Sequence, residues 1–253
     1  MANSFFKQIK IITLPKVKST NDFALQKLKS GDANPGDIIV AKYQEAGRGQ
    51  NQSKWFSSDG TNLLLSFICK DIQLKTTQIP ALNMLVSLGL FNVVNNFFNN
   101  QTTIKWPNDI LVNEKKIAGT LIETSIQGDF IKNAVIGIGL NVNEESFPEY
   151  LPNACSFYTL LGMYSDLDSI LKIIIEQMDL HLSKLKQTPF EELKENYESV
   201  LFGMGAIRYF RNSQKNFEGI IRGLNSNGQL CVETENRIET FNHKEITFDL
   251  GKH

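Results

Sequence analysis

The segment from Ile104 to Glu123, IKWPNDILVNEKKIAGTLIE, combines side chains that can handle charge. It otherwise has the pattern of two short strands, and it is too polar for a simple core hairpin. A lysine, an aspartate and close approach to the backbone suit a phosphate or carboxylate with its metal ion. A solvated hairpin with outward charges fits equally well, so both interpretations stay open here. The polar members are Lys105, Asn108, Asp109, Lys115, Lys116 and Glu123.

A rigid corner is expected inside this segment. Pro107 fixes its own φ and biases Trp106 toward an extended conformation, so the strand at residues 103–106 should end there. Asn108 and Asp109 then lie at the corner, where an amide and a carboxylate can face a pocket instead of pairing in a ladder.

The chain should return as a hairpin, with strand residues 110–112, a turn at 113–115 and a second strand at 117–122. Lys116 opens the return strand. The small residues after it, Gly119 among them, leave room for a ligand to approach the backbone.

Ser19, Thr20 and Asn21 stand where a helix should begin, after a strand at residues 9–14. The helix is expected to run to about residue 30 and to stop at Gly31. Helix capping is the plainer explanation of the three polar residues. Three consecutive hydrogen-bonding side chains can also hold a polar group of a ligand.

A long polar loop separates two expected buried strands, residues 37–43 and 63–68. A loop of more than about ten residues inside a compact domain is usually functional or mobile. Gly47 and Gly49 flank Arg48, and glycines let backbone N–H groups turn toward an anion. The triplet is weak evidence by itself, because glycine-rich loops are more often simple turns.

Scaffold elements account for much of the remaining chain. Residues 77–98 have the apolar pattern of a long buried helix. A strand at 130–143 carries Gly137 and Gly139 at alternate positions, which leaves one face bare for a flat group or for a neighbouring backbone.

The C-terminal third is expected to contain two helices and then a small β unit. Turn residues between alternating apolar and polar runs predict a small β-barrel of roughly 45 residues. The helices are predicted at 169–186 and 191–201, a boundary at 202–205, strands within 206–248, and turns at 211–215 and 225–228.

Composition narrows the functional class. The 253 residues are 42% hydrophobic with a formal net charge of -1, so one large domain, or one large and one small, is expected, without a global basic field for nucleic acid. The three cysteines are far apart and form no CxxC, which argues for a reducing compartment and against structural zinc.

The first 16 residues lack a long apolar stretch with a small-residue cleavage site. No run approaches the roughly 18 apolar residues expected of a spanning helix. A cytoplasmic protein without a membrane partner is therefore expected.

The motifs STN, YQEAGRG, KWPND with KKIAGTLIE, and GIGLNVN occur in this order along the chain. In combination they resemble biotin protein ligases, also called biotin–[acetyl-CoA-carboxylase] ligases, over nearly the whole sequence. The resemblance implies an α/β (α+β) fold, with a mixed-sheet catalytic domain like class II aminoacyl-tRNA synthetases and a small C-terminal SH3-like β-barrel. It implies a biotin- and ATP-binding catalytic domain at residues 1–202 and a small β domain at 203–253.

The implied activity has two steps. Biotin and MgATP give biotinyl-5′-AMP and pyrophosphate, and biotin then passes to a lysine of the biotin carboxyl carrier protein or domain of a biotin-dependent carboxylase. The resemblance thus implies ATP, Mg²⁺ and biotin as the small molecules. A homodimer is possible on the same basis, but the sequence does not determine the oligomeric state. The few residues before Ser19 leave no room for the N-terminal winged-helix domain of some relatives, so a short form that does not bind DNA is expected.

The resemblance also assigns site residues. The biotin contacts of the family map onto Ser19, Thr20, Asn21, Gln44, Arg48, Gly49, Gln50 and Lys116, with Gly119 close to Lys116. The adenylate side maps onto Trp55, Asn108, Asp109 and Asn141.

Four of the charged residues are expected to be catalytic: Lys116, Asp109, Lys105 and Arg48. Joining a carboxylate to a triphosphate needs positive charge and positioning more than a proton shuttle. Lys116 can bridge the biotin carboxylate and the α-phosphate, while Lys105 supports the phosphates. Asp109 can help to hold Mg²⁺ and is a candidate to assist deprotonation of the carrier lysine.

The loop after Arg48 departs from the usual GRGRxGRxW pattern of the family. Gln50, Gln52 and Ser53 occupy positions of Arg, Gly and Arg, while Trp55 remains. Fewer cations should weaken the grip on the adenylate phosphate. We predict that biotinyl-AMP dissociates faster here than from arginine-bearing relatives, and a rate no faster than theirs would count against this.

The same residues fit other functions less well. A lipoate or octanoate ligase shares the scaffold, but Gln44 and the cluster at 19–21 favour a ureido ring over an apolar ligand that would leave them unpaired. A catalytically idle binding module would not require both Lys116 and Asp109. A dehydrogenase lacks GxGxxG after a strand, and nucleophilic catalysis with histidine is disfavoured because no motif contains His181, His243 or His253.

Overall fold

A mixed sheet forms the main body of the computed structural model, which describes residues 4–50, 53–235 and 237–249. The strand order is β1-β2-β3-β8-β7-β6-β5, with β4 paired to β8. β1 and β2 run parallel, and the other ladders are antiparallel. The strands are β1 (Lys10–Val17), β2 (Asp37–Gln44), β3 (Leu63–Cys69), β4 (Leu74–Lys75), β5 (Thr102–Lys105), β6 (Asp109–Val112), β7 (Lys115–Gln127) and β8 (Phe130–Leu140).

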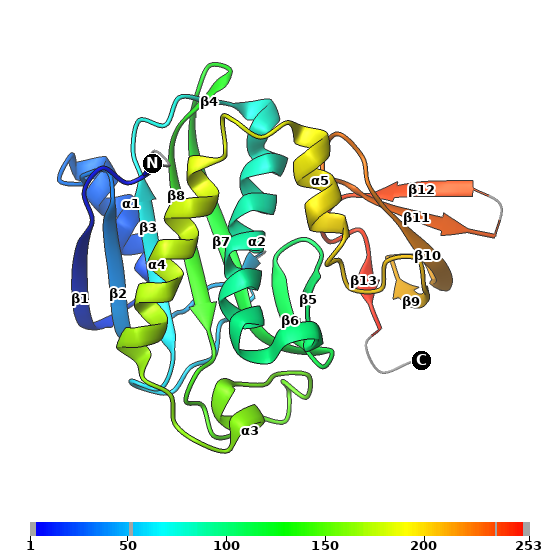
Figure 1. The fold of residues 1–253 in the computed structure, drawn as a ribbon, viewed down its shortest axis with the longest axis horizontal. Coiled ribbons are helices and arrows are strands. Elements are labelled where there is room, and N and C mark those ends of the chain that lie inside the picture. The colour runs from blue at the N-terminus through cyan, green and yellow to red at the C-terminus, as the bar shows by residue number, and fades with distance from the viewer. Residues whose placement is uncertain (1–3, 51–52, 236, 250–253) are drawn as a thin grey trace.

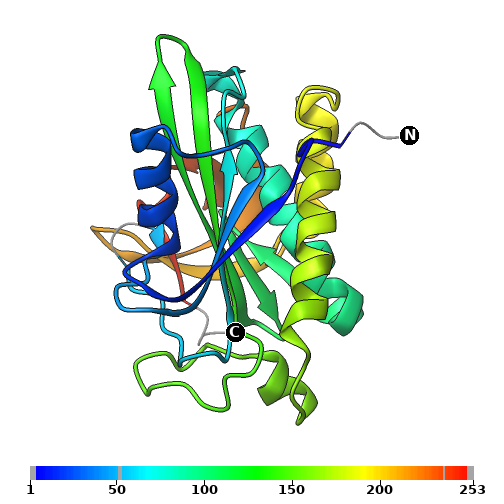
Figure 2. The same cartoon turned by 90° about the vertical axis from the view of Figure 1, so that its left-hand side faces the viewer.

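Helices cover the two faces of this sheet unequally. In Figures 1 and 2, α1 (Thr20–Ser30) lies on one face, whereas α2 (Ile79–Phe98) and α4 (Leu167–Ser183) lie on the other. α5 (Phe190–Glu198) follows α4 and leads toward a second, smaller sheet. The single helix on the α1 face leaves part of that face available for a cavity. The short elements are α3 (Phe157–Leu161), η2 (Thr76–Gln78) and η3 (Asn99–Gln101).

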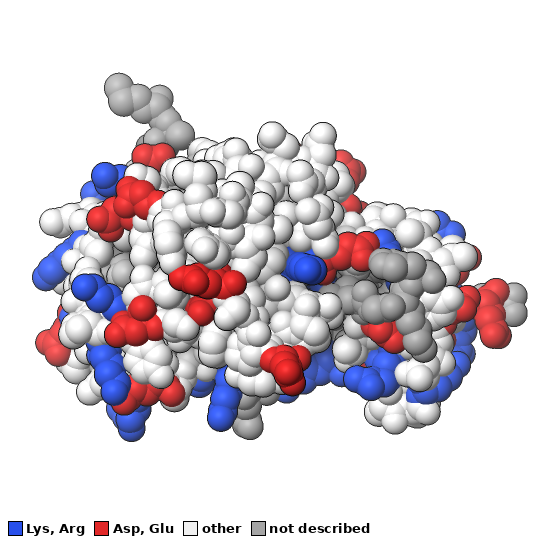
Figure 3. All heavy atoms as spheres, turned by 90° about the horizontal axis from the view of Figure 1, so that it is seen from below, with Lys and Arg blue, Asp and Glu red and all other residues white. Residues whose placement is uncertain are grey.

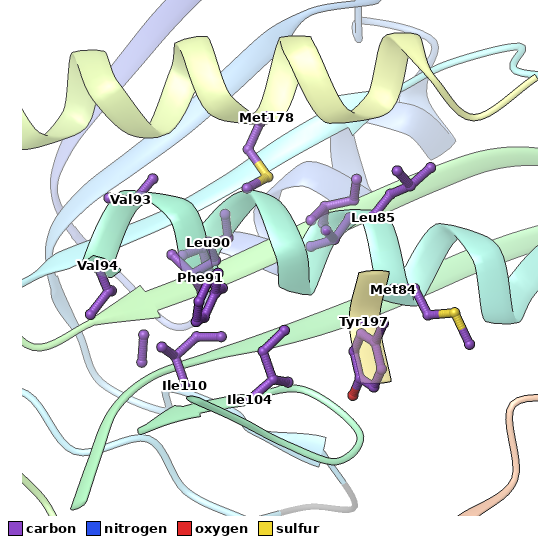
Figure 4. Close-up of a cluster of buried hydrophobic side chains, with 14 of the residues drawn as sticks. Met84, Leu85, Leu90, Phe91, Val93, Val94, Ile104, Ile110, Met178 and Tyr197 are labelled. Carbon is purple, nitrogen blue, oxygen red and sulfur yellow. The ribbon is translucent and has the colours of Figure 1, made fainter. Parts of the chain in front are cut away.

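The main core fills the space between α2, α4 and the sheet. Figure 4 shows Leu90 and Phe91 of α2 directed toward Ile104 and Ile110, with Met178 of α4 above them. Each such side chain contributes roughly 1.5–3 kcal/mol by burial. These strands are therefore held rigidly from the side opposite to α1.

α2 corrects one expectation. The stretch Thr76–Gln101 is long and apolar enough, by length and composition, to cross a membrane, contrary to the expectation that no stretch is. In this structure 61% of an apolar 18-residue segment within this stretch is buried. The apolar residues cover the sheet and α4, so the helix has the surroundings of a core helix.

A five-stranded antiparallel sheet forms the C-terminal part, in the order β12-β11-β10-β9-β13. Turns at Asn212–Lys215 and Asn225–Gly228 connect its hairpins where the sequence predicts them. Figure 1 shows this sheet beside α5 and the β5–β6 hairpin. Its strands are β9 (Ile207–Arg211), β10 (Asn216–Leu224), β11 (Leu230–Thr234), β12 (Arg237–Phe241) and β13 (Thr247–Phe248).

The expected fold class, a mixed-sheet α/β body followed by a small β unit, is confirmed. The strands and helices from β1 to α5 lie within a few residues of their predicted positions. The expectation missed β4 and α3, and it ended the return strand β7 five residues early, at Ile122 instead of Gln127. β7 continues because it pairs with β8 as far as Gln127.

Candidate active site

A cavity of about 680 Å³ opens on the α1 face of the large sheet. It is bounded by the start of α1, the end of β2 with its following loop, the β5–β6 corner, the first half of β7, the end of β8, and the end of the small sheet. From the predicted site it gathers Ser19, Thr20, Asn21, Gln44, Arg48, Gly49, Gln50, Trp55, Lys105, Asn108, Asp109, Lys116 and Gly119.

One end of the cavity is a network of hydroxyls and amides. Ser19 caps α1, its Oγ accepting from the N–H of Asp22, so the capping interpretation is correct for this residue. The backbone N–H of Thr20 donates to Gln44 Oε1 at 2.7 Å. Ser66 Oγ lies 2.6 Å from Asn21 Oδ1. Ser19 therefore both caps α1 and lines the cavity, and Thr20 and Asn21 line the cavity from the first turn of the helix.

The alternating glycines of β8 accommodate side chains of this protein. A Cβ at Gly137 would overlap the amide of Asn21, and a Cβ at Gly139 would overlap the indole of Trp55. From the sequence, the bare strand face is expected to accommodate either a flat group or a neighbouring backbone. The flat group is Trp55 itself, which lies on β8 and forms a wall of the cavity.

The other end of the cavity is charged. Lys116 Nζ lies 2.6 Å from Asp109 Oδ1, and Lys105 Nζ lies 3.2 Å from Asp109 Oδ2. Burial raises the pKa of Asp109, but the two ammonium groups outweigh burial and hold this pKa below its usual value. Asp109 is therefore an anion between two cations. Lys116 Nζ also lies 5.5 Å from the centre of the Trp55 ring.

The predicted corner positions this charged cluster. Pro107 follows a cis Trp106–Pro107 peptide bond, and its carbonyl accepts from Tyr197 Oη at 2.9 Å. Asn108 donates its amide to the carbonyl of Thr120 on β7. Asp109 thus begins β6 opposite Gly119, where a Cβ would lie 3.3 Å from Asp109 Oδ1. Gly119 makes room for Asp109 and Lys116.

Arg48 points to two carboxylates. Its guanidinium lies 2.5 Å from Asp22 Oδ1 and 3.1 Å from Glu123 Oε2. Arg48 also forms an isolated antiparallel bridge with Lys54, closing a small loop. Gln52, one of the departures from the family pattern, lies outside the described residues.

The small sheet supplies a wall that the sequence motifs did not indicate. Its lining residues are His243, Lys244, Ile246, Thr247 and Phe248. Trp106 Nε1 donates to the carbonyl of Gly228 at 3.0 Å, and its ring lies edge-on to His243. These residues follow no recognisable motif, and they lie more than a hundred positions after Trp106 in the chain. Only the packing of the two sheets brings them to the cavity.

Asn141 is the one predicted site residue that does not line the cavity. It is buried, and its amide donates to the carbonyl of Cys155 at 3.0 Å. Its Oδ1 has no hydrogen-bond partner among the described residues.

Two other buried polar atoms lie on the cavity wall without a partner in the described part of the chain: Trp55 Nε1 and Gln50 Oε1. Buried polar atoms are nearly always paired with protein, water or a bound molecule. These two atoms are therefore suited to a polar ligand.

Of the residues that the structure describes, Asp109 alone offers a carboxylate to a metal ion in this cavity. The described residues contain no group of three or more His, Cys, Asp or Glu side chains suited to a metal. Mg²⁺ commonly binds through one or two carboxylates together with substrate phosphates and water. The single aspartate fits a magnesium ion that arrives with a nucleotide and does not fit a metal centre built from protein ligands alone.

The chain is similar to several known proteins. Residues 13–141 match the model of the biotin/lipoate A/B protein ligase family. The bifunctional ligase/repressor BirA of Bacillus subtilis is 31% identical over 234 residues, which cover 91% of this chain and 71% of that protein. The biotin–[acetyl-CoA-carboxylase] ligase of Mycobacterium tuberculosis is 25% identical, with 93% of this chain and 87% of that protein covered.

A solved structure is also similar. The biotin protein ligase from Aquifex aeolicus in complex with biotin and ATP superposes with a TM-score of 0.77 at 27% identity, and the match covers 94% of this chain and 98% of that chain. The resemblance to biotin protein ligases seen in the sequence motifs is thereby confirmed. With the family model matching half of its length, the chain belongs to the biotin/lipoate A/B protein ligase family.

Proposed function

We propose that this protein is an ATP-dependent, AMP-forming biotin protein ligase. It activates biotin to biotinyl-5′-AMP and transfers the biotinyl group to a lysine of a biotin carboxyl carrier protein. The observation that carries this proposal is the two-ended cavity, in which a hydroxyl and amide network faces the Lys116–Asp109–Lys105 cluster across the same space.

The polar end suits the ureido ring of biotin. Thr20, Asn21 and Gln44 provide donors and acceptors already fixed by hydrogen bonds among themselves and to neighbouring strands. A ureido ring can add hydrogen bonds to this preset network, whereas an apolar dithiolane or bare acyl chain cannot, and each polar group that a ligand buries without a partner costs roughly 1–3 kcal/mol. Ser19, Gly49, Gln50 and Gly119 complete the proposed biotin contacts.

The charged end suits the carboxylate and the nucleotide phosphates. Lys116 lies beside both Asp109 and Trp55, so its ammonium can neutralise the biotin carboxylate and the α-phosphate together. Trp55 offers a ring face to the adenine. Asn108 fixes the corner that carries Asp109. Asn141, which is buried and does not line the cavity, is proposed to contribute to adenylate binding.

The first step needs no protein nucleophile. A carboxylate oxygen of biotin attacks the α-phosphorus of ATP, and the bond to the bridging oxygen breaks so that pyrophosphate leaves with the electron pair. Lys105 and Lys116 stabilise the charge on the phosphates. Asp109 would hold Mg²⁺ on the protein side, where the ion would neutralise charge on the phosphates.

In the second step the amine of the carrier lysine attacks the acyl carbon of biotinyl-AMP. The bond to the phosphate oxygen breaks, AMP leaves, and the amine loses a proton. We propose that Asp109 assists this proton transfer, because among the described residues it is the one carboxylate that lines the cavity.

The wider setting is proposed on the same basis. All three cysteines are free, which fits the reducing cytoplasm. We divide the chain into a catalytic domain of residues 1–202 and a small β domain of 203–253. Figure 3 shows acidic and basic side chains interspersed over the face it presents, in keeping with a protein substrate as partner more than with nucleic acid.

The test is biotin-dependent exchange of labelled pyrophosphate into ATP, with lipoate and octanoate as parallel substrates. Lys116→Ala should lower exchange at least about 100-fold, because a charge-assisted contact in the transition state is lost. Lys115→Ala is the matched control, since Lys115 is exposed and lines a separate, smaller cavity. Silence with biotin would overturn the proposal, and exchange with lipoate or octanoate would reassign the substrate.

A further inference from the structure

Glu123 is a carboxylate of β7 that the proposed reaction does not use. Its side chain is 27% exposed and lies between two elements of the biotin end of the cavity. On one side Oε1 and Oε2 accept from Arg48 Nη2 at 3.2 and 3.1 Å. On the other side Oε2 accepts from Asn21 Nδ2 at 2.7 Å. One carboxylate therefore joins the start of α1 to the loop after β2.

The Asn21 side of this link is fully constrained. The amide donates to the carbonyl of Leu121 at 3.2 Å as well as to Glu123, and its Oδ1 lies 2.6 Å from the hydroxyl of Ser66. Gly137 lets the amide lie directly against β8. A shift of the Glu123 carboxylate would therefore reorient an amide that faces the ligand.

The Arg48 side fixes a loop. Arg48 bridges Lys54, and the N–H of Gly49 donates to the carbonyl of Ser53 at 2.7 Å, so Arg48 and Gly49 are tied to Ser53 and Lys54. Asp22, in the first turn of α1, binds the same guanidinium. The position of Arg48 thus sets the position of the loop that carries Gln50 and leads to Trp55.

We infer that Glu123 is a positioning residue that couples Asn21 to the Arg48 loop and thereby organises the biotin end of the cavity. This inference rests on the proposed function for its ligand. The charge of Arg48 is directed to Asp22 and Glu123, so Arg48 acts by holding the loop, and Lys116 remains the cation that meets the carboxylate of biotin.

The central variant is Glu123→Gln, which keeps the size and an acceptor for Asn21 but removes the charge that holds Arg48. It should raise the KM for biotin about five- to tenfold, in line with the loss of a networked ion pair, and change kcat less than about twofold. Asp22→Asn, which removes only the other partner of Arg48, should give a smaller rise. The control is Glu176→Gln, an exposed site on α4 across the sheet.

A double-mutant cycle separates positioning from general damage. If Glu123 acts through Arg48, Glu123→Gln combined with Arg48→Gln should raise the KM for biotin by less than the product of the two single changes. Multiplicative effects in the cycle, or a Glu123→Gln variant with unchanged KM, would overturn the inference. Urea unfolding of each variant identifies any that fail to fold, in which case Asp22→Asn carries the cycle.

A measurement without substrate keeps this inference separate from the proposed function. Trypsin should cut after Lys54 faster in Glu123→Gln than in the wild type or in Glu176→Gln, because the loop has lost its anchor. If the wild type fails to exchange pyrophosphate with biotin but the cleavage difference is found, the ligase proposal falls and the loop anchor stands. Equal cleavage rates would refute the anchor whatever the substrate.

Discussion

At the scale of single residues, the site depends on how Asp109 is balanced between two lysines. One carboxylate contacts Lys116 and Lys105 through separate oxygens. Without a ligand this arrangement keeps two like charges close together at a half-buried position. We propose that the same lysines pair with the phosphate and carboxylate anions of the substrates. Asp109 therefore stabilises the cluster by pairing with both lysines, and we propose that it also holds the metal ion of the nucleotide.

Asp109→Asn should lower the free energy of unfolding by about 1–3 kcal/mol at pH 7, because two charge-assisted contacts become weaker and two ammonium groups lose their counterion. The folded pKa of Asp109 lies below its ordinary value of 3.8. Its stabilisation is thus present above that pH and is lost as the pH falls through the folded pKa. Urea unfolding at pH 7, 5 and 3 should show the difference from the wild type shrinking at pH 3, and a constant difference would contradict this.

Gln50 is expected to influence the dissociation rate of biotinyl-AMP. Its Oε1 is buried at the cavity wall without a partner among the described residues. Gln50→Arg should slow dissociation of biotinyl-AMP about tenfold, because a cation at this position can pair with the adenylate phosphate. Gln127→Arg adds the same charge at the exposed far end of β7 and serves as control. Equal dissociation rates for the two variants would remove the proposed role of this position.

At the scale of secondary-structure elements, β8 determines how close other groups approach the sheet. Gly137 and Gly139 lie on the cavity face at successive inward positions, opposite Leu121 and Gly119 of β7. Each glycine receives one side chain, Asn21 or Trp55. The strand thereby holds Asn21 and Trp55 two residues apart along the cavity, and we propose that these two positions mark its biotin end and its nucleotide end.

The two glycines act as controls for each other. Gly139→Ala should raise the KM for ATP at least about tenfold with a smaller effect on biotin, because the new methyl group displaces the indole of Trp55. Gly137→Ala should show the opposite preference, because its methyl group displaces Asn21. Steady-state kinetics with each substrate varied in turn would measure both. Identical patterns for the two variants would contradict the separation of the two ends.

At the scale of the whole molecule, the cavity is complete only when the small sheet lies against the catalytic body. Glu198 at the end of α5 accepts from the backbone N–H of Leu224 at 2.6 Å, and Trp106 donates to Gly228. Lys105 Nζ lies 5.5 Å from the centre of the Phe248 ring. The wall formed by the small sheet therefore faces the charged end of the cavity.

Trp106→Phe keeps an aromatic ring and removes the donor to Gly228. It should weaken the contact between the two sheets by about 1 kcal/mol and raise the KM for ATP more than that for biotin. Amide hydrogen exchange should become faster in β9 to β13 than in β1 to β8. Faster exchange confined to the large sheet would contradict the expected weakening of the contact between the two sheets.

The sequence by itself determined most of the elements, because the information is local. Hydrophobic periodicity marks α2, Ser19 and Gly31 mark the two ends of α1, and Pro107 marks the corner. The polar residues of the motifs also had to lie in loops or at strand ends. The family resemblance could be stated from the same short motifs, each of which is continuous in the chain.

Tertiary structure decided which of these residues meet. The sequence could not show that Trp55 fills the bare face at Gly139, that Glu123 joins Asn21 to Arg48, or that residues 243–248 close the cavity. Each of these contacts joins segments many residues apart, and no local pattern records the register of β7 against β8 or the packing of one sheet on another. Side-chain type therefore determined the available chemistry, while sheet register and packing of the small sheet determined where that chemistry converges.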